Sequence, residues 1–154
     1  MVSFPNYYEQ YLNSELMEQY KEPCIIDLPR IYDPRGNLTF VENGQGLIPF
    51  AIERVYWTYD VPAGEGRGGH SHHEAQELIV ATSGSFRVNL FDGKEWRHYT
   101  LNLPYKGLYV PPGYWRTLDN FSSGSVCMVL TSTTYSEEDY VREFDDFLKL
   151  TVDR

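Results

Sequence analysis

Short segments of alternating apolar and polar residues, separated by turn signals, run through most of this chain. The turn signals are D-P-R-G-N at 33–37, N-G-Q-G at 43–46, D-G at 92–93 and P-P-G at 111–113, in which proline presets φ and glycine allows positive φ. The segments that we expect to be strands are 24–28, 38–42, 52–59, 77–81, 96–101, 107–110 and 126–132, with 84–91 continuing the 77–81 strand past a glycine. Such frequent turns are typical of a β-sandwich or barrel, so the pattern predicts an all-β fold.

Helical spacing is confined to the two ends of the chain. Residues 7–21 place aromatic and apolar side chains at roughly helical intervals, so we expect a short helical extension within 1–22. At the other end, 136–150 predicts a helix, because Ser136 can cap it and acidic residues occupy its first turn. There is no repeat or linker, and 154 residues is the size of one domain, so 1–154 is expected to fold as a single domain.

The net charge and the cysteines narrow the function classes. A formal net charge of −9 argues against nucleic acid or an anionic membrane as partner, since both need a basic surface, but a small anionic ligand needs only a local cationic patch. Cys24 and Cys127 are flanked by apolar residues, which favours two buried free thiols over a disulfide. With no signal-peptide pattern and no apolar run of transmembrane length, we expect a cytoplasmic protein.

The stretch from Gly64 to Gly84 concentrates the groups that can carry chemistry. His70 and His72 are two residues apart, so in a strand both imidazoles project from the same face. Arg67 precedes the pair and Glu77 follows it. Two histidines beside an arginine and a carboxylate favour a functional site over hydrogen bonding inside a polar interior.

This stretch fits G-x5-H-x-H-x4-E-x6-G, which resembles the first motif of the cupin superfamily, a small jelly-roll barrel. The second cupin motif, P-x-G-x2-H-x3-N, is matched by 111–120 except that Arg116 stands where the fourth metal ligand, a histidine, is usual. The resemblance implies an all-β cupin jelly-roll barrel and leaves the activity open, because this fold hosts many chemistries.

Three interpretations of the histidine pair are open at this point. His70, His72 and Glu77 form the two-histidine, one-carboxylate set of a metal centre. Alternatively the histidines act without metal as acid and base, or they are structural. Arg116 weighs against the metal, because a fixed cation beside a divalent ion costs Coulomb energy, and Glu77 is then the anion that pairs with it.

Longer segments resemble one cupin family, the dTDP-4-keto-6-deoxyglucose 3,4-ketoisomerases. They are I-P-F-A-I-E-R-V-Y-W (48–57), R-G-G-H-S-H-H (67–73), S-G-S-F-R-V (83–88), K-G-L-Y-V-P-P-G-Y-W-R (106–116), D-N-F-S-S-G (119–124) and Y-S-E-E-D-Y-V-R-E-F-D-D-F (135–147), so the resemblance covers about 25–150. It implies a metal-free, cofactor-free homodimer in which His70 and His72 serve catalysis. Two positions depart from the family: Ser71 replaces alanine, and Glu77 replaces glutamine and thereby restores the metal-type motif.

The implied reaction converts a dTDP-linked 4-keto-6-deoxy sugar into its 3-keto isomer, for deoxyaminosugars of surface polysaccharides. One histidine removes the C3 proton and the other relays protons through an enediol. We expect Arg67 and Tyr59 to stabilise the negative oxygen. The substrate-binding candidates are Arg35, Arg54 and Arg116 for the diphosphate, Trp57 and Trp115, with Tyr56, for stacking on thymine, and Glu77. The alternatives are a metal-dependent cupin enzyme using His70, His72 and Glu77, and a non-catalytic sugar-nucleotide-binding cupin.

Overall fold

The computed structural model describes residues 20–154, and the helix expected over 7–21 lies, apart from its last two residues, outside them. The elements are β1 Cys24–Asp27, β2 Arg30–Ile31, β3 Leu38–Thr39, β4 Arg54–Tyr59, β5 Arg67–His72, β6 Glu77–Ser83, β7 Phe86–Phe91, β8 Trp96–Leu101, β9 Lys106–Val110, β10 Trp115–Asp119, β11 Val126–Thr131, the 3-10 turn η1 Glu137–Asp139, β12 Tyr140–Val141 and α2 Phe144–Leu150. No helix within this part of the chain is long and apolar enough to cross a bilayer.

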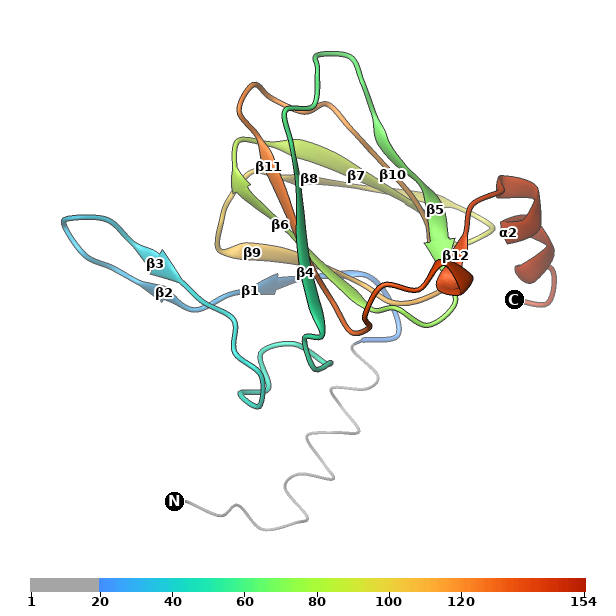
Figure 1. Cartoon of the computed structure of the whole chain (residues 1–154), viewed down its shortest axis with the longest axis horizontal. Coiled ribbons are helices and arrows are strands. Elements are labelled where there is room, and N and C mark those ends of the chain that lie inside the picture. The colour runs from blue at the N-terminus through green and yellow to red at the C-terminus, as the bar shows by residue number, and fades with distance from the viewer. Residues whose placement is uncertain (1–19) are drawn as a thin grey trace, which may run out of the picture.

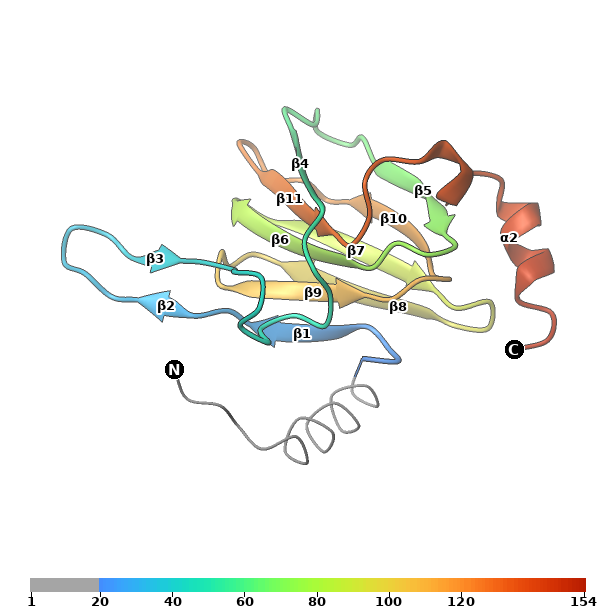
Figure 2. The ribbon, with the colours of Figure 1, turned by 60° about the horizontal axis from the view of Figure 1, so that its bottom comes forward.

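Two antiparallel five-stranded sheets form the body of the molecule, in the orders β1-β9-β6-β11-β4 and β12-β5-β10-β7-β8. The two-stranded β2–β3 hairpin projects from one end of this sandwich, and α2 lies at the opposite end (Figures 1 and 2). The all-β prediction is therefore confirmed. One detail differs: residues 84–91 do not extend β6, because the chain turns at Gly84, with φ 65°, and β7 joins the other sheet.

Alternation along the strands separates three apolar clusters. The central cluster fills the space between the sheets, with Ile79 and Val129 from one sheet and Val88 and Leu90 from the other. A second cluster lies on the outer side of β6, β9 and β11, beneath residues 41–52. The third joins α2 to the outer side of the other sheet. Because both faces of each sheet are partly covered, inward and outward residues of one strand serve different clusters.

The C-terminal helix is shorter than predicted. It begins at Phe144, and Ser136 makes no side-chain capping bond. Tyr140 and Val141 instead form β12, which pairs with His72 and Ser71 at the edge of the second sheet. The prediction of a helix from Ser136 is thus wrong for residues 137–143, because an open strand edge competes with local helical preference and hydrogen-bonds this segment.

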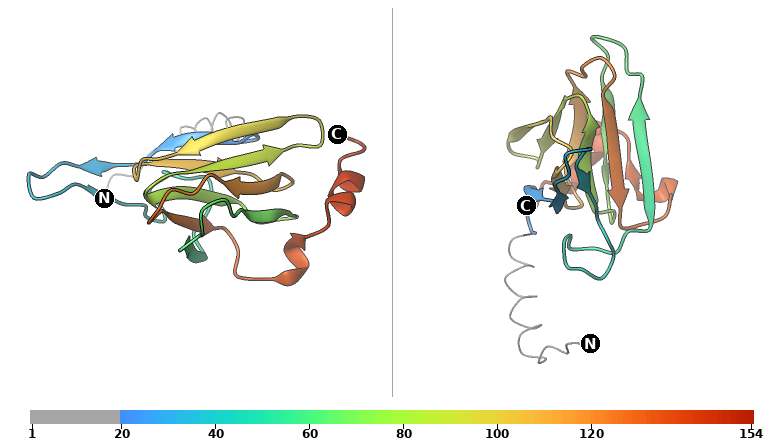
Figure 3. Two further views of the ribbon diagram at one scale, coloured as in Figure 1. Left: turned by 90° about the horizontal axis from the view of Figure 1, so that it is seen from above. Right: turned by 90° about the vertical axis from the view of Figure 1, so that its left-hand side faces the viewer.

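The helix α2 docks through Phe147 against the outer side of the second sheet (Figure 3). Phe147 is buried and its ring lies 5.7 Å from the ring of Trp115, centroid to centroid. Both cysteines are free, as expected; Cys127 is buried and Cys24 half-buried.

Candidate active site

A cluster of charged and polar groups occupies one end of the interior between the two sheets. His70 and His72 come from β5, Glu77 from β6 and Arg116 from β10. Glu77 is on the same face of β6 as Ile79, and Arg116 on the same face of β10 as Leu118, so strand alternation turns them inward. His72, Glu77 and Arg116 are 1–2% exposed. Charges buried this deeply are stable only when they are paired.

Strand register brings these side chains together. His70 is the partner of Arg116 across the β5–β10 ladder, and His72 is the partner of Tyr140 across β5–β12. The two imidazole rings lie 5.0 Å apart, edge to face. The Tyr140 ring lies 5.1 Å from His70 and 4.4 Å from His72, so it covers the pair from the sheet edge.

Glu77 is the anionic centre of the cluster. One of its oxygens, Oε1, lies 2.8 Å from Nε2 of His72 and 2.7 Å from Nη1 of Arg116. Both contacts bring nitrogen and oxygen within ion-pair distance, so the carboxylate is stabilised electrostatically from two sides. Burial alone would raise the pKa of Glu77, but the positive charge of Arg116 and the adjacent His72 outweigh it and lower this pKa to about 2. Glu77 is therefore a permanent carboxylate near neutral pH.

His72 is held at both ring nitrogens. Its Nδ1 lies 2.9 Å from a carboxylate oxygen of Asp139, opposite the contact between Nε2 and Glu77. A ring with a carboxylate at each nitrogen donates to both only in the imidazolium form. The orientation of the His72 ring is thus fixed from two sides.

His70 has the opposite environment. Its Nε2 is buried and has no hydrogen-bond partner among residues 20–154. Burial, followed by the positive charges of Arg116 and His72, lowers the pKa of His70 to about 3. The imidazole is therefore neutral at physiological pH, with a ring nitrogen available to accept a proton from a bound molecule.

His70, the partly exposed member of the histidine pair, is reached through a basic mouth. A small interior cavity of about 90 Å³ touches His70, Glu77 and Arg116. A wider hollow of about 610 Å³ meets it at Tyr56, Arg67 and His70. The remaining side chains around that hollow include Arg54, Tyr135, Tyr140 and Arg142. Three guanidinium groups beside four aromatic or imidazole rings suit an anionic ligand that also carries a flat ring.

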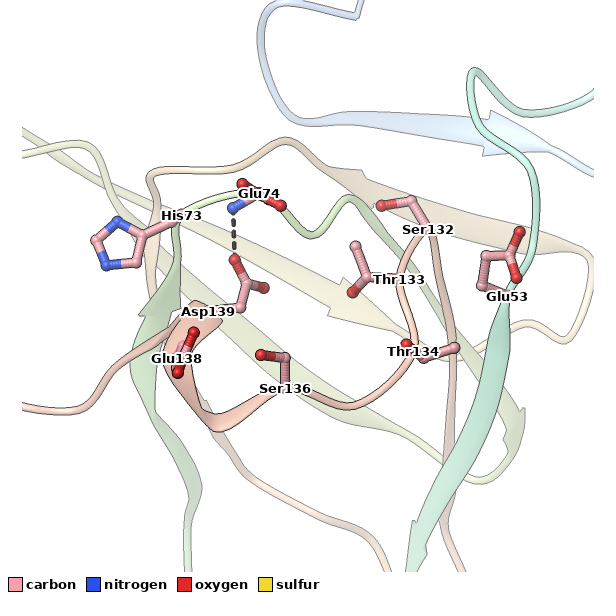
Figure 4. A pocket seen from close by; sticks show the side chains of 9 residues that line it. All are labelled: Glu53, His73, Glu74, Ser132, Thr133, Thr134, Ser136, Glu138 and Asp139. Carbon is pink, nitrogen blue, oxygen red and sulfur yellow. Dashed lines mark hydrogen bonds between the residues drawn. The ribbon is translucent and has the colours of Figure 1, made fainter.

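A larger hollow on the same side of the molecule has the opposite charge. Its volume is about 690 Å³, and it is lined by His73 together with the carboxylates of Glu53, Glu74, Glu138 and Asp139 (Figure 4). Four carboxylates repel a phosphate. The basic hollow beside His70 therefore suits an anionic ligand better, although it is the smaller of the two.

The same cluster contains the donor set of a metal centre. Ligand atoms of His70, His72 and Glu77 lie within 4.8 Å of one another. Two imidazoles and a carboxylate fit a divalent transition metal in chemical type. Arg116 opposes it, because its guanidinium lies 2.7 Å from Oε1 of Glu77, and a fixed cation this close repels a divalent ion. This geometry matches the expectation that Glu77 pairs with Arg116.

Two of the predicted residues on β4 lie on the wrong face for this site. Trp57 and Tyr59 are 59% and 61% exposed on the outer face of that strand. Arg54 and Tyr56 alternate with them and reach the basic hollow. Tyr59 therefore cannot stabilise charge beside the histidines, and Trp57 cannot stack in this hollow; the parity of the strand, which sequence spacing alone left open, decides this.

Two further candidates are also displaced. Trp115 is buried against Phe144 and Phe147 of α2, on the outer side of β10, so it is a core residue and does not stack on a ligand. Arg35 lies in the turn between β2 and β3 and is paired with Asp33 at 2.9 Å. Figure 1 shows this hairpin at the end of the sandwich away from β5, the strand of the histidines. Arg67 and Arg54 are at the mouth, as predicted.

Four site residues were not predicted: Tyr135, Asp139, Tyr140 and Arg142. The last three follow Ser136, in the segment that was interpreted as helix. The available signal was the composition of Y-S-E-E-D-Y-V-R, which combines aromatic, acidic and basic groups with a β-branched residue. Only the pairing of β12 with β5 shows that they reach the histidines.

The two-sheet jelly roll, with an inward H-x-H pair and an arginine from the second motif, defines a cupin. The chain belongs to the family described as "FdtA: WxcM-like, C-terminal", whose model matches residues 21–152. A TDP-4-oxo-6-deoxy-alpha-D-glucose-3,4-oxoisomerase from Aneurinibacillus thermoaerophilus is 42% identical over 128 residues, which cover 83% of this chain and 91% of that protein.

Solved structures of two enzymes of this type match closely. The 3,4-ketoisomerase QdtA from Thermoanaerobacterium thermosaccharolyticum, as a mutant in complex with TDP-4-keto-6-deoxyglucose, is 34% identical with a TM-score of 0.83, covering 87% of this chain and 96% of its own. The WlaRB TDP-quinovose 3,4-ketoisomerase from Campylobacter jejuni is 38% identical with a TM-score of 0.79, covering 84% and 98%. The chain is thus similar to sugar-nucleotide isomerases along nearly its whole described length.

Proposed function

We propose that this protein is a sugar-nucleotide 3,4-ketoisomerase that converts a dTDP-linked 4-keto-6-deoxyhexose into its 3-keto isomer, in deoxysugar biosynthesis. The observation that carries the proposal is the contrast between the two histidines: His70 lines the cavity and has a ring nitrogen without a partner among the described residues, whereas His72 is held between two carboxylates. Two groups tuned apart in this way suit one proton acceptor and one proton carrier.

In the proposed mechanism, Nε2 of His70 removes the proton from C3, and the electron pair forms the C3–C4 double bond of an enediolate with negative charge on the C4 oxygen. His72 then transfers the proton of the C3 hydroxyl to the oxygen on C4. His70 returns its proton to carbon at C4, which leaves a ketone at C3. Arg116, 2.7 Å from Glu77, adds positive charge near the developing oxyanion. No atom is gained or lost.

The nucleotide would occupy the basic hollow. Arg54, Arg67 and Arg142 surround it, and guanidinium binds a diphosphate bidentately. Tyr56 and Tyr135, each with its ring beside Arg54, offer faces for the thymine or the sugar. Arg54 and Tyr56 keep the roles predicted from the sequence, while Arg67, Arg142 and Tyr135 take the place of Arg35, Trp57 and Trp115.

The direct test is incubation of the protein with dTDP-4-keto-6-deoxyglucose in D₂O, followed by NMR. Formation of the 3-keto product is expected, with deuterium at C4 of the product and, through reversal of the first step, at C3 of the remaining substrate. Binding of the nucleotide without exchange or product would instead indicate a non-catalytic sugar-nucleotide-binding cupin.

Changing each histidine to asparagine separates their roles. His70→Asn and His72→Asn should each reduce turnover by about 10²–10⁴-fold, the usual contribution of a positioned acid or base. His70→Asn should also stop C3 exchange, while His72→Asn retains it. Calorimetry with dTDP checks that binding survives in both variants. Near-normal turnover in both would show that the H-x-H pair is structural.

The metal-dependent alternative has its own test. We expect activity to persist after dialysis against a chelator, because Arg116 occupies the approach to Glu77. Elemental analysis that finds about one equivalent of iron, zinc or manganese, required for activity, would reverse this assignment. Glu77 would then be a ligand, and Glu77→Gln should abolish metal binding.

We also propose a homodimer and a cytoplasmic location. Support for the dimer comes from β4, an edge strand whose outer face exposes Val55, Trp57 and Tyr59. The free thiols of Cys24 and Cys127 suit a reducing compartment.

A further inference from the structure

Asp139 reaches the catalytic cluster from outside both cupin motifs. It lies in η1, just before the edge strand β12, and its Oδ2 lies 2.9 Å from Nδ1 of His72. The side chain of Asp139 is only 10% exposed and that of His72 1%. This carboxylate is on the side of the ring opposite Glu77, whose Oε1 lies 2.8 Å from Nε2.

A carboxylate at Nδ1 controls two properties of an imidazole. It keeps the proton on that nitrogen, which selects the tautomer, and it fixes the plane of the ring. In the serine-protease triad, an aspartate in this relation holds the imidazole in the correct tautomer without receiving its proton. His72 needs the same control here, because its neighbours on the remaining sides are rings and charges: His70, Tyr140, Glu77 and Arg116.

We propose that Asp139 is a positioning residue for His72: it accepts the Nδ1 proton and thereby holds Nε2 against Glu77, beside His70 and the cavity in which the sugar is isomerised. The catalytic part of this inference rests on the proposed function. Asp139 itself does not line the basic hollow or the interior cavity, so it acts only through the ring.

Asp139 also has a second set of contacts that any test must separate. Its Oδ1 accepts from the backbone N–H of Glu74 at 2.6 Å, and its Oδ2 accepts from Ala75 at 3.2 Å (Figure 4). Its own backbone carbonyl accepts from the N–H of His73 at 2.9 Å. Asp139 therefore also holds the loop that joins β5 to β6, and a variant that loosens this loop could lower activity for a structural reason.

The chain offers a matched control for this loop. The hydroxyl of Ser132 accepts from the N–H of Gln76 at 2.9 Å, next in the same loop, and touches neither histidine. Ser132→Ala removes one loop contact while leaving the Asp139–His72 contact in place. Asp139→Asn keeps the contact with Glu74, because its amide oxygen can still accept there, while its NH₂ group faces both Nδ1 of His72 and the N–H of Ala75. It therefore removes the histidine contact together with one loop contact, and Ser132→Ala matches the loop part of that loss.

The first measurement needs no substrate. Nitrogen-15 NMR of the histidine rings reports which nitrogen carries a proton. In the unmodified protein and in Ser132→Ala, Nδ1 of His72 should be protonated. In Asp139→Asn that proton should be lost from Nδ1 and the neutral ring should be protonated at Nε2. An unchanged His72 spectrum in Asp139→Asn would overturn the proposal.

The second measurement is kinetic. Asp139→Asn should lower kcat by about 10- to 100-fold, the effect typical of a partner that orients a functional histidine, with KM within about twofold. In a His72→Asn background the same change should have no further effect, because there is no ring left to position. A loss of similar size in Ser132→Ala, or a further loss in the double variant, would assign the effect to the loop. If the unmodified protein turns over no 4-keto sugar, the proposed function fails, while the NMR result still decides whether Asp139 controls His72.

Discussion

His70 and His72 share a residue type, a strand and a face, yet their surroundings differ in every respect that matters for proton transfer. Two carboxylates bracket one ring, and the other has an unpartnered nitrogen under positive charge. The difference comes from residues distant in sequence, Glu77, Arg116 and Asp139. An H-x-H motif therefore specifies where two imidazoles point, and the residues around it specify what each one does.

The lowered pKa of His70 predicts a pH dependence of stability. The unfolded chain binds a proton at this histidine below about pH 6.5, whereas the folded protein resists it down to about 3. The free energy of unfolding is thus undiminished by His70 above pH 6.5, falls as the pH drops, and stops falling only below 3. Between pH 7 and pH 5 the loss from this residue should be about 2 kcal/mol.

Urea unfolding at pH 7 and pH 5 measures this contribution. In His70→Asn the difference between the two pH values should shrink by about that amount. His73→Asn, which removes an exposed histidine nearby, is the control and should leave the difference nearly unchanged. The pKa of Glu77, about 2, does not interfere, because its loss of stabilising charge begins only below about pH 4.5. An identical pH difference in the protein and in His70→Asn would contradict the assignment.

At the scale of the element, β5 depends on a glycine. Gly68 has φ +86°, and a Cβ built there would lie 2.9 Å from the carbonyl oxygen of Arg116 on the neighbouring strand. The register between β5 and β10 shifts between Arg116 and Thr117, opposite this point. A bulge with a left-handed glycine changes the direction of the side chains that follow it, here that of His70.

Gly69 is the natural comparison, since it has φ +80° but no atom within 4 Å of a built Cβ. Gly69→Ala should destabilise the protein by about 1–2 kcal/mol from backbone conformation alone. Gly68→Ala adds the steric contact and should cost about 2–4 kcal/mol, with a larger loss of turnover. Chemical denaturation of the two variants checks the order, and equal destabilisation would mean that the close approach to β10 is unimportant.

The sequence predicts an element well where neighbouring residues decide its structure, and poorly where pairing with a distant strand decides it. Alternation and turn residues predicted β8 and β9 almost to the residue, because neighbouring positions determine them. The prediction for the segment after Ser136 was wrong, because its acidic first turn favours a helix locally, whereas the open edge of β5 pairs with it as β12. The strand β10 was not predicted either, since W-R-T-L-D has too few residues to show a period.

Site residues within motifs of fixed spacing were predicted correctly, and those that depend on which face of a strand is inner were not. His70, His72, Glu77 and Arg116 belong to motifs with fixed spacing, and the structure brings them together. Tyr59 and Trp57 were predicted to face the site, but they lie on the opposite face of β4 from Arg54 and Tyr56. A shift of one residue exchanges the faces of a strand, and nothing within I-E-R-V-Y-W-T-Y decides which face is inner, because both carry aromatic rings.

At the scale of the whole molecule, the outer face of β4 predicts self-association. Trp57 and Tyr59 are each about 60% exposed beside Val55, on a strand whose outer edge is unpaired in this chain's described sheets. We expect light scattering to give a dimer at micromolar concentration. Trp57→Ala should shift the population toward monomer, and the control Trp96→Ala, an exposed tryptophan on the other sheet, should not. A monomeric unmodified protein would contradict the expectation.

The charged end of the sandwich interior lowers the stability that the same space would give if it were filled with apolar side chains. Arg116 and Glu77 rank among the largest fully buried side chains, in a space where the central cluster elsewhere places leucine and valine. Buried ion pairs are often no more stabilising than well-packed apolar residues of the same volume. Substitutions that make this end apolar are thus expected to raise thermal stability as they remove the proton-transfer groups, so selection for heat resistance alone would drive this chain toward a better-packed and inactive protein.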